Sequence, residues 1–365
     1  MTSLLKGLNG IPFGLVGKKH IIRIPSIVIV GEDILDSVVD VVSSLGIKSA
    51  LIVTGNKTRK IAGEFVQELL LRRNVRTKVF LVPQPSLAYA QQGVELYSKF
   101  KFDAVIGVGG GKNLDVSKVI AKETGAFFIS VPTTASHDGI ASPFASLIER
   151  KGKYSLTAVP PIAVIADIDI ISKAPPRFYR AGIGDIMANV NAVQDWLLSH
   201  KVRGEYYGEY AANLALMSAY HLLKNESVLS NGDKEAIRTL VEALISSGIA
   251  MGIAGSSRPG SGSEHLFSHA LDKIAERPAL HGEQCGIGTI MMLYYRGDDQ
   301  WIRVKEFFTN IGVPTKARAL GLSKEEIIEA LITAHKIRPE RYTILGERGL
   351  TREEAIKIAK ETGVI

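Results

Sequence analysis

The second half of the chain contains histidines and acidic residues whose spacing suits a metal site. His265 and His269 are one helical turn apart, so both project from the same side of a helix. Two histidines and one acidic residue can hold a metal with three ligands and leave a fourth position for substrate or water. Glu264 precedes the first histidine, which excludes the H-E-x-x-H motif of zinc proteases. Spacing alone leaves the choice of ligands open.

The first half contains a glycine-rich turn with the composition of a phosphate-binding loop. It reads Gly107-Val108-Gly109-Gly110-Gly111-Lys112-Asn113-Leu114-Asp115 and joins an expected strand to an expected helix. Glycines let a backbone approach a ligand closely, and a helix N-terminus favours a pyrophosphate. The pattern matches neither G-x-G-x-x-G nor G-x-x-x-x-G-K-[ST], so by itself it is also compatible with a tight turn that binds nothing.

A second polar turn follows the next expected strand. It reads Pro132-Thr133-Thr134-Ala135-Ser136-His137-Asp138-Gly139. Two such turns at the ends of neighbouring strands indicate a cofactor crevice more strongly than either turn alone.

Short apolar runs alternate with helical patterns through the first half. Expected strands cover residues 26–30, 49–54, 78–82, 103–108 and 127–131, and expected helices cover 34–45, 58–73, 87–100 and 115–123. Strands that are apolar throughout and separated by helices predict a mostly parallel sheet covered on both faces. We therefore expect a doubly wound α/β N-terminal domain.

The second half changes to long segments with helical periodicity. Expected helices cover residues 185–200, 209–223, 234–252 and 263–275, and capping-box spacings at Ser323 and Thr351 predict two more. We expect an all-α C-terminal domain and place the boundary at Ala174-Pro175-Pro176. The predicted domains are residues 1–175, which bind the dinucleotide, and 176–365, which bind metal and substrate. Ligands bind at the carboxyl ends of parallel strands, so we expect the active cleft between the domains.

The composition excludes several classes of protein. The 365 residues carry a net charge of +7, but the basic residues are dispersed, so we expect no nucleic-acid partner. No apolar stretch is long enough for a membrane helix, and we expect neither an integral membrane segment nor a signal peptide. The single cysteine, Cys285, excludes an intrachain disulfide and fits a cytoplasmic protein.

Taken together, these segments resemble the glycerol-1-phosphate dehydrogenase family. The resemblance rests on the two turns and on Gly182-Ile183-Gly184-Asp185, Ser261-Gly262-Ser263-Glu264-His265-Leu266-Phe267-Ser268-His269 and His281-Gly282-Glu283-Gln284. It covers nearly the whole chain, in the same order. The family belongs to a superfamily with glycerol dehydrogenase, iron-type alcohol dehydrogenases and dehydroquinate synthase.

The resemblance implies both an activity and a set of site residues. The implied reaction interconverts dihydroxyacetone phosphate and sn-glycerol 1-phosphate with NAD(H) or NADP(H), and supplies the glycerophosphate backbone of archaeal membrane ether lipids. Asp185, His265 and His281 would hold one Zn²⁺ per subunit. These three residues would act in catalysis through that metal. Implied dinucleotide contacts are Gly109, Gly110, Gly111, Lys112, Asn113, Leu114, Asp115, Thr133, Thr134, Ala135, Ser136 and Ser142. Implied substrate contacts are Asp138, Asp185 and His269, the last also a candidate catalytic residue. The family further implies a homo-oligomer, with a dimer favoured.

Two further expectations come from the residues themselves. The substrate phosphate needs a cationic pocket, and Arg258 just precedes the His265 helix, so we expect Arg258 to bind that phosphate. NAD-selective enzymes usually place a carboxylate near the ribose hydroxyls, but no carboxylate follows Thr54 at that position. Three cations, Lys57, Arg59 and Lys60, stand there instead. We therefore expect NADP(H) to be accepted as well as NAD(H).

Other readings remain open from the sequence. One alternative is a lyase of the dehydroquinate synthase type, and another is a glycerol dehydrogenase that acts on the unphosphorylated substrate. A third is a nucleotide-binding protein without catalysis. The ligand set suits Zn²⁺ but would also accept Fe²⁺.

Overall fold

Six apolar runs in the first half of the chain form a single parallel sheet. In the computed structural model, which describes residues 13–149 and 152–365, the strand order is β3-β10-β7-β6-β4-β5. The strands are β3 (Ile27–Gly31), β4 (Ser49–Thr54), β5 (Arg76–Leu81), β6 (Ala104–Gly109), β7 (Phe127–Pro132) and β10 (Ala163–Asp167). Every neighbouring pair is parallel. The four inner strands are buried at every residue, as expected for a sheet covered on both faces.

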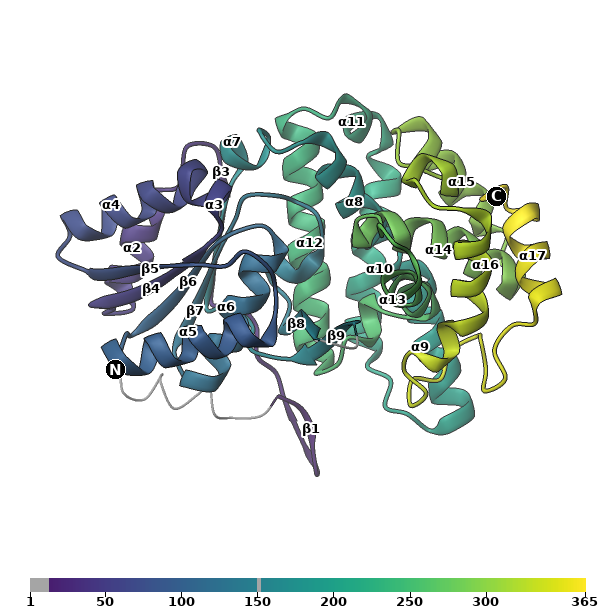
Figure 1. Cartoon of the computed structure of the whole chain (residues 1–365), viewed down its shortest axis with the longest axis horizontal. Helices are drawn as coiled ribbons and strands as arrows, with labels where there is room; N and C mark the ends of the chain where they lie inside the picture. Colours follow the sequence, from purple (N-terminus) through teal and green to yellow (C-terminus); the bar gives the residue numbers. More distant parts are fainter. Residues whose placement is uncertain (1–12, 150–151) are drawn as a thin grey trace. The chain divides into compact units, whose positions relative to one another are not determined.

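Helices cover both faces of this sheet (Figure 1). The helical elements of this half are α2 (Ser37–Ser44), α3 (Asn56–Thr58), the π-helix Arg59–Gly63, α4 (Glu64–Arg72), α5 (Leu87–Phe100), α6 (Gly111–Thr124), a 3₁₀ turn (Asp138–Ile140) and α7 (Ile168–Ile171). Valines and leucines of α2 and α4 pack on Ile52, Ile106 and Ile165 of the sheet. Two hairpins lie outside the sheet, β1 (Gly14–Val16) with β2 (Lys19–Ile21), and β8 (Phe144–Glu149) with β9 (Gly152–Thr157). The predicted doubly wound α/β fold is confirmed.

The rest of the chain is helical, also as predicted. Its α-helices are α8 (Pro176–Met187), α9 (Asn189–Arg203), α10 (Glu209–Lys224), α11 (Glu226–Asn231), α12 (Lys234–Ala254), α13 (Ser263–Ile274), α14 (His281–Arg296), α15 (Gln300–Asn310), α16 (Lys324–Thr333) and α17 (Arg352–Glu361). Short 3₁₀ turns cover Arg258–Gly260, Ala317–Leu320 and Ala334–Lys336. Residue contacts divide the chain into two compact units, Met1–Ala174 and Pro175–Ile365, which we call unit 1 and unit 2.

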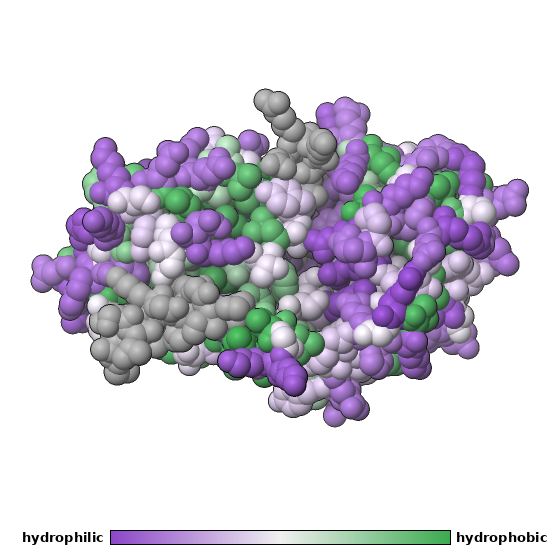
Figure 2. Space-filling model, turned by 90° about the horizontal axis from the view of Figure 1, so that it is seen from below, coloured by the Kyte–Doolittle hydropathy of each residue, from purple (hydrophilic) through white to green (hydrophobic). Residues whose placement is uncertain are grey.

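No stretch long enough for a membrane helix is expected from the sequence, but α12 is one described helix that is long and apolar enough to cross a membrane, by length and composition only. Two thirds of its most apolar window, 67%, is buried inside the protein, so its composition is that of a core helix. The surface view shows hydrophobic side chains in separate patches among hydrophilic ones (Figure 2). Apolar atoms normally contribute a large share of a folded protein's surface.

Candidate active site

The glycine turn in unit 1 gives helix α6 an open N-terminus. Gly109, the last residue of β6, has a φ of +151°, and a Cβ there would lie 2.4 Å from Asn113 Oδ1. Only glycine therefore fits at this position. Gly110 caps α6 without a side-chain hydrogen bond, so the first N–H groups of a 14-residue helix remain available to a ligand. Such an end suits a pyrophosphate.

Asn113, one turn into α6, provides a further polar group for a ligand. The residue is 1% exposed, yet neither its Nδ2 nor its Oδ1 has a hydrogen-bond partner among the described residues. Its amide lies beside the turn after β4, where a Cβ on Gly55 would be 3.5 Å from Nδ2. A buried amide without a partner is costly, so this position fits a residue whose partner is a bound molecule.

The second polar turn lies directly beside the first. Strands β6 and β7 pair in parallel, with Gly109 opposite Pro132, so their carboxyl ends share one edge of the sheet. The amide of Thr133 donates to the carbonyl of Gly109 over 3.1 Å. A Cβ on Gly110 would lie 3.1 Å from Thr134 Oγ1, which shows how closely the two loops approach.

Three of the predicted dinucleotide residues already have roles inside the protein. Leu114 is fully buried in the core. Asp115 accepts a hydrogen bond from the amide of Ser146 over 3.1 Å, and it lies 3.5 Å from Lys118 Nζ. Lys112 Nζ donates to the carbonyl of Pro83 over 3.0 Å. The remaining predicted contacts lie on the two turns, except Ser142, whose amide donates to the carbonyl of Asp138.

In unit 2, closely packed glycines bring three helices together around the metal-ligand candidates. A Cβ on Gly282 would lie 1.9 Å from the carbonyl oxygen of Ala181, and one on Gly184 would lie 2.2 Å from the carbonyl oxygen of Gly282. Helices α8 and α14 can therefore approach only with glycine at these positions. Gly288 allows a similar approach of α14 to α13, since a Cβ there would lie 3.1 Å from the carbonyl oxygen of Glu264.

This packing places Asp185, His265 and His281 around one point. Oδ1 of Asp185 is 3.9 Å from Nε2 of His265 and 3.8 Å from Nε2 of His281. The two imidazole centroids are 4.8 Å apart. Each residue comes from a different helix, and a carboxylate with two imidazoles is a donor set typical of catalytic zinc. The residues therefore fit the metal that the family resemblance implies.

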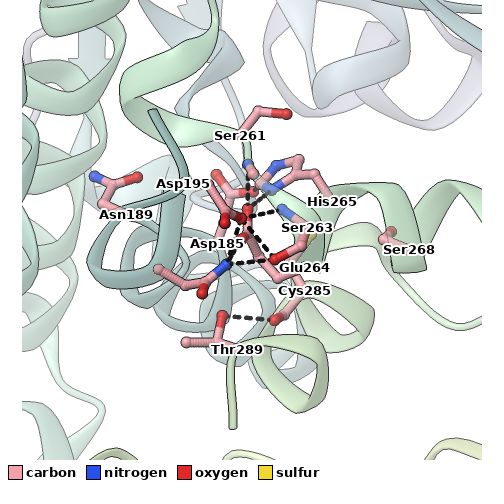
Figure 3. Close-up of polar contacts among 12 residues, drawn as sticks. Asp185, Asn189, Asp195, Ser261, Ser263, Glu264, His265, Ser268, Cys285 and Thr289 are labelled. Carbon is pink, nitrogen blue, oxygen red and sulfur yellow. Dashed lines mark hydrogen bonds and ion pairs between the residues drawn. The ribbon is translucent and has the colours of Figure 1, made fainter. Parts of the chain in front are cut away.

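Hydrogen bonds behind His265 orient its ring. Nδ1 of His265 is 2.8 Å from Oε1 of Glu264, which is fully buried and also accepts from the amide of Gly262. Burial opposes ionisation of Glu264, but the hydrogen bonds from His265 and Gly262 keep the pKa of its carboxyl below the usual value. A carboxylate at Nδ1 fixes the proton there and leaves the Nε2 lone pair for the metal. Figure 3 shows Asp185, Glu264 and His265 gathered at this point.

His281 also has a hydrogen-bond partner at Nδ1, although the partner is different from that of His265. Its Nδ1 is 3.0 Å from Oγ of Ser268, and that hydroxyl donates to Oε1 of Gln284 over 2.7 Å. Because the hydroxyl proton is used by Gln284, the serine oxygen accepts from Nδ1 and leaves Nε2 unprotonated. Both histidines thus present Nε2 toward Asp185.

Cys285 adds a fourth side chain to this cluster, one that spacing did not suggest as a ligand. Its donor atom and those of Asp185, His265 and His281 all lie within 4.8 Å of one another. However, Sγ is 3.7 Å from Nε2 and 3.9 Å from Nδ1 of His281, so it is not on the outward line from Nε2 where a metal would bind. Burial, and then the Asp185 carboxylate, raise the pKa of the thiol well above its usual value. The geometry therefore favours three ligands and an open fourth position.

The predicted substrate residues lie in both units. His269 follows His265 by one turn on α13 and stacks on His281 with ring centroids 5.6 Å apart. Its side chain is 8% exposed and lies 3.8 Å from Asp272. Asp138 begins the 3₁₀ turn after the second polar loop of unit 1.

The surroundings of Arg258 argue against the expectation that it binds the substrate phosphate. The residue is 2% exposed, and its guanidinium forms a two-point ion pair with Glu205. It also donates to the carbonyl of Tyr342 over 2.9 Å and to Oγ of Ser199 over 3.2 Å. All three of its nitrogens are engaged by the protein, so Arg258 ties segments of unit 2 together. Sequence position could not reveal this, because Glu205 and Tyr342 are distant in the chain.

Comparison with known proteins agrees with this geometry. A family model described as iron-containing alcohol dehydrogenase matches residues 29–175. A protein from Staphylothermus marinus named glycerol-1-phosphate dehydrogenase (NAD(P)+) is 50% identical over 349 residues, covering 95% of this chain and 98% of its own. The protein of the same name from Pyrococcus furiosus is also 50% identical, over 95% of this chain and 100% of its own.

Solved structures show the same fold at lower identity. A probable glycerol dehydrogenase from Sinorhizobium meliloti superposes with a TM-score of 0.79 at 22% identity, covering 94% of this chain and 99% of its own. Glycerol dehydrogenase from Schizosaccharomyces pombe gives a TM-score of 0.78 at 20% identity, with coverage of 96% and 91%.

Proposed function

Because the chain belongs to the glycerol-1-phosphate dehydrogenase family, we propose that it interconverts dihydroxyacetone phosphate and sn-glycerol 1-phosphate, with NAD(P)(H) as the hydride carrier. The observation that carries this proposal is 50% identity along nearly the full length of both chains. The open helix end of unit 1 and the three-ligand cluster of unit 2 supply the two kinds of site that the reaction needs.

In this proposal, unit 1 holds the dinucleotide. The N–H groups at the start of α6 would bind the pyrophosphate, and the buried amide of Asn113 would bind a polar group of the same molecule. The loop Thr133–Ser136 would close on it from the neighbouring strand end, and Ser142 would contact it nearby.

Asp185, His265 and His281 would hold a divalent metal, for which Zn²⁺ is our proposal, one per subunit. When bound, this metal supplies a Lewis acid for the C2 oxygen of the substrate. Asp138, Asp185 and His269 would orient the substrate. His269, which stacks on a ligand but is not itself in the ligand set, would exchange a proton with the C2 oxygen, directly or through water.

The nucleotide preference follows from charges near the end of β4. Lys57, Arg59 and Lys60 are exposed there, and among the residues that the structure describes only Arg59 of the three has a carboxylate partner, Glu64, at 3.1 Å. We propose that Lys57 and Lys60 accommodate the 2′-phosphate, so that NADPH is used as well as NADH. Measurement of kcat/KM with NADH and with NADPH tests this proposal. Strict selectivity for NADH would contradict it.

The cellular role that we propose follows from the reaction. The product would serve as the glycerophosphate backbone of archaeal membrane ether lipids, formed by a cytoplasmic enzyme. We also propose a homodimer, to be tested by the mass of the protein in solution.

Oxidation of NADPH or NADH by the purified protein tests the proposed reaction. We expect steady consumption with dihydroxyacetone phosphate and much slower consumption with dihydroxyacetone. Equal rates with the two would favour a glycerol dehydrogenase. A lyase of the dehydroquinate synthase type returns the hydride within each turnover, so absence of net consumption would favour that alternative.

The H269A variant tests the role of His269. We expect it to keep its metal, because all three ligands remain, and to lose about 100-fold or more in kcat, as is common when a proton-transfer group is removed. An unchanged rate and substrate affinity would show that His269 has neither role.

A further inference from the structure

Asp195 on α9 is a fully buried carboxylate that the proposed reaction does not use. Its Oδ2 accepts hydrogen bonds from the amide of Ser263 over 2.7 Å and from the hydroxyl of Ser263 over 2.6 Å. Its Oδ1 accepts from Nη2 of Arg296 over 2.5 Å and from the amide of Ile344 over 2.8 Å. A buried carboxylate is stable only when it is paired and hydrogen-bonded, so these contacts hold Asp195 in one position against three other segments of unit 2.

Arg296 is the charge partner of Asp195, and it ends a helix that begins with a metal-ligand candidate. It is the last residue of α14, whose first residue is His281. Its side chain is 13% exposed, and its Nη2 also donates to Oδ1 of Asn191 over 3.3 Å. The pair therefore ties the far end of α14 to α9, and removal of either charge would leave the other buried without its partner.

Asp195 also supplies a cap that helix α13 lacks in its own sequence. Gly262 precedes the helix and forms no side-chain cap there. Asp195 takes this place from another helix, because it binds both the amide and the hydroxyl of Ser263, the first residue of α13. A Cβ on Gly262 would lie 2.7 Å from Oδ2 of Asp195, so the close approach needs a glycine. A negative charge at a helix N-terminus stabilises the helix.

Asn191 connects Asp195 to the carboxylate behind the ligand His265. It lies one turn before Asp195 on α9, and its Nδ2 is 3.2 Å from Oδ2 of Asp195. The same nitrogen donates to Oε2 of Glu264, whose Oε1 is 2.8 Å from Nδ1 of His265. Figure 3 shows Asp195, Glu264 and His265 close together. The contacts therefore run without a gap from Asp195 to the ring of a metal ligand.

We propose that Asp195 is a positioning residue for the metal centre, which acts through His265 without being a ligand itself. It fixes His265 in two ways, by capping the first turn of α13 and by holding Glu264 through Asn191. Arg296 balances the charge of Asp195 and so keeps the buried carboxylate in place. This inference rests on the metal site of the proposed function, and it assigns the affinity and geometry of that site in part to α9.

The D195N variant tests this proposal with Co²⁺ as the probe. Asparagine keeps the shape of the side chain but replaces one acceptor oxygen by a donor, which would face an N–H group of Ser263 or Arg296. Loss of a carboxylate that orients a metal ligand usually lowers metal affinity about 10- to 100-fold, and we expect a loss in this range. Competition with a chelator, at a temperature at which the full-length variant is folded, measures the dissociation constant of Co²⁺.

The absorption spectrum of bound Co²⁺ separates positioning from a purely structural role. Its d–d bands depend on the geometry of the ligands, so a tilted His265 ring should shift them in D195N. A purely structural role would lower the free energy of unfolding and leave both the bands and the dissociation constant at their wild-type values.

A milder variant and a matched control accompany D195N. S263A removes the hydroxyl that bonds Asp195 and Asn191 but keeps the amide, and it should weaken Co²⁺ binding about fivefold. If D195N does not fold, S263A decides alone. D298N is the control, because Asp298 also bonds to α9, through Gln194 over 2.7 Å, but lies outside these contacts. It should bind Co²⁺ like the wild type.

The results distinguish failure of this inference from failure of the proposed metal site. Wild-type affinity and wild-type Co²⁺ bands in every folded variant of D195N and S263A would overturn the inference and leave the metal site intact. If the wild-type protein bound no Co²⁺, or if D185N bound it as tightly as the wild type, the proposed metal site would fail and this inference with it.

Discussion

At the scale of single residues, the orientation of the two histidine ligands depends on groups that do not touch the metal position. Glu264 fixes the proton of His265 on Nδ1, and the Ser268–Gln284 pair does the same for His281. Asn191 in turn donates to Glu264, and Asp195 accepts from the amide and hydroxyl of Ser263. The ligand helix is therefore held in place from α9.

Replacing Glu264 by glutamine should weaken metal binding while preserving the shape of the side chain. Loss of a second-shell carboxylate usually lowers metal affinity about 10- to 100-fold, and we expect a loss in this range for E264Q. Competition with a chelator measures it. E276Q removes an exposed carboxylate from the same unit and should match the wild type. If E264Q matches it too, Glu264 does not orient the ligand.

Asn113 allows a separate test of the dinucleotide site. Because its buried amide has no partner in the described protein, N113A should raise the KM for the nucleotide about 10-fold and leave the KM for dihydroxyacetone phosphate unchanged. A matched N310A variant removes an amide that pairs with Glu226 at the surface and should change neither value. If N113A raised only the KM for dihydroxyacetone phosphate, Asn113 would contact the substrate and not the nucleotide.

At the scale of elements, glycines decide how closely the ligand helices pack. A Cβ at residue 282 would collide with the backbone of α8 at 1.9 Å, whereas one at residue 286 would meet the ring of Phe308 at 3.3 Å. We therefore expect G282A to lower the free energy of unfolding by about 3 kcal/mol or more and to weaken metal binding, since the backbone must move.

The G286A variant is the matched control. Its tightest contact is with a side-chain ring, and the backbone of α8 at Gly184 Cα is 3.4 Å away, an ordinary van der Waals distance, so we expect a smaller loss, about 1 kcal/mol. Denaturant unfolding and metal analysis measure both variants. Equal stability of G282A and G286A would show that the distance between α8 and α14 is not set by glycine.

The elements also show what the sequence could predict. Helix α5 and the inner strands β4, β6 and β7 follow from apolar periodicity, and the expected helix 87–100 has the bounds that α5 has in the structure. Strand β10 is not among the expected strands; in the structure it follows the β8–β9 hairpin, whereas β4, β5, β6 and β7 each follow a helix. The expected helix 185–200 is in fact the end of α8 and most of α9, which divide at Ala188.

The candidate site shows a different limit. Helical spacing pairs His265 with His269, whereas the structure groups His265 with His281 from another helix and with Asp185 from a third. Tertiary packing decides which side chains form this ligand set, so spacing along the chain does not predict it. In the sequence analysis the set comes only from the family resemblance. The engagement of Arg258 by Glu205 likewise depends on contacts between distant segments.

At the scale of the whole molecule, a metal held by three helices should stabilise unit 2 as a whole. A ligand at 100 times its dissociation constant stabilises the folded state by about 2.7 kcal/mol, so we expect chelation to lower the Tm and restored metal to recover it. The D185N variant, which lacks one ligand, should show little change on chelation. If the Tm of the wild type did not change when the metal was removed by a chelator, that result would contradict a metal site formed by α8, α13 and α14.

The configuration of the product tests the central claim most directly. The protein should be incubated with dihydroxyacetone phosphate and NADPH, and the glycerol phosphate that forms should be offered to a dehydrogenase specific for sn-glycerol 3-phosphate. The account predicts a glycerol phosphate that this second enzyme does not oxidise, because it is the sn-1 isomer. Complete oxidation of the product, or formation of no glycerol phosphate at all, would contradict it.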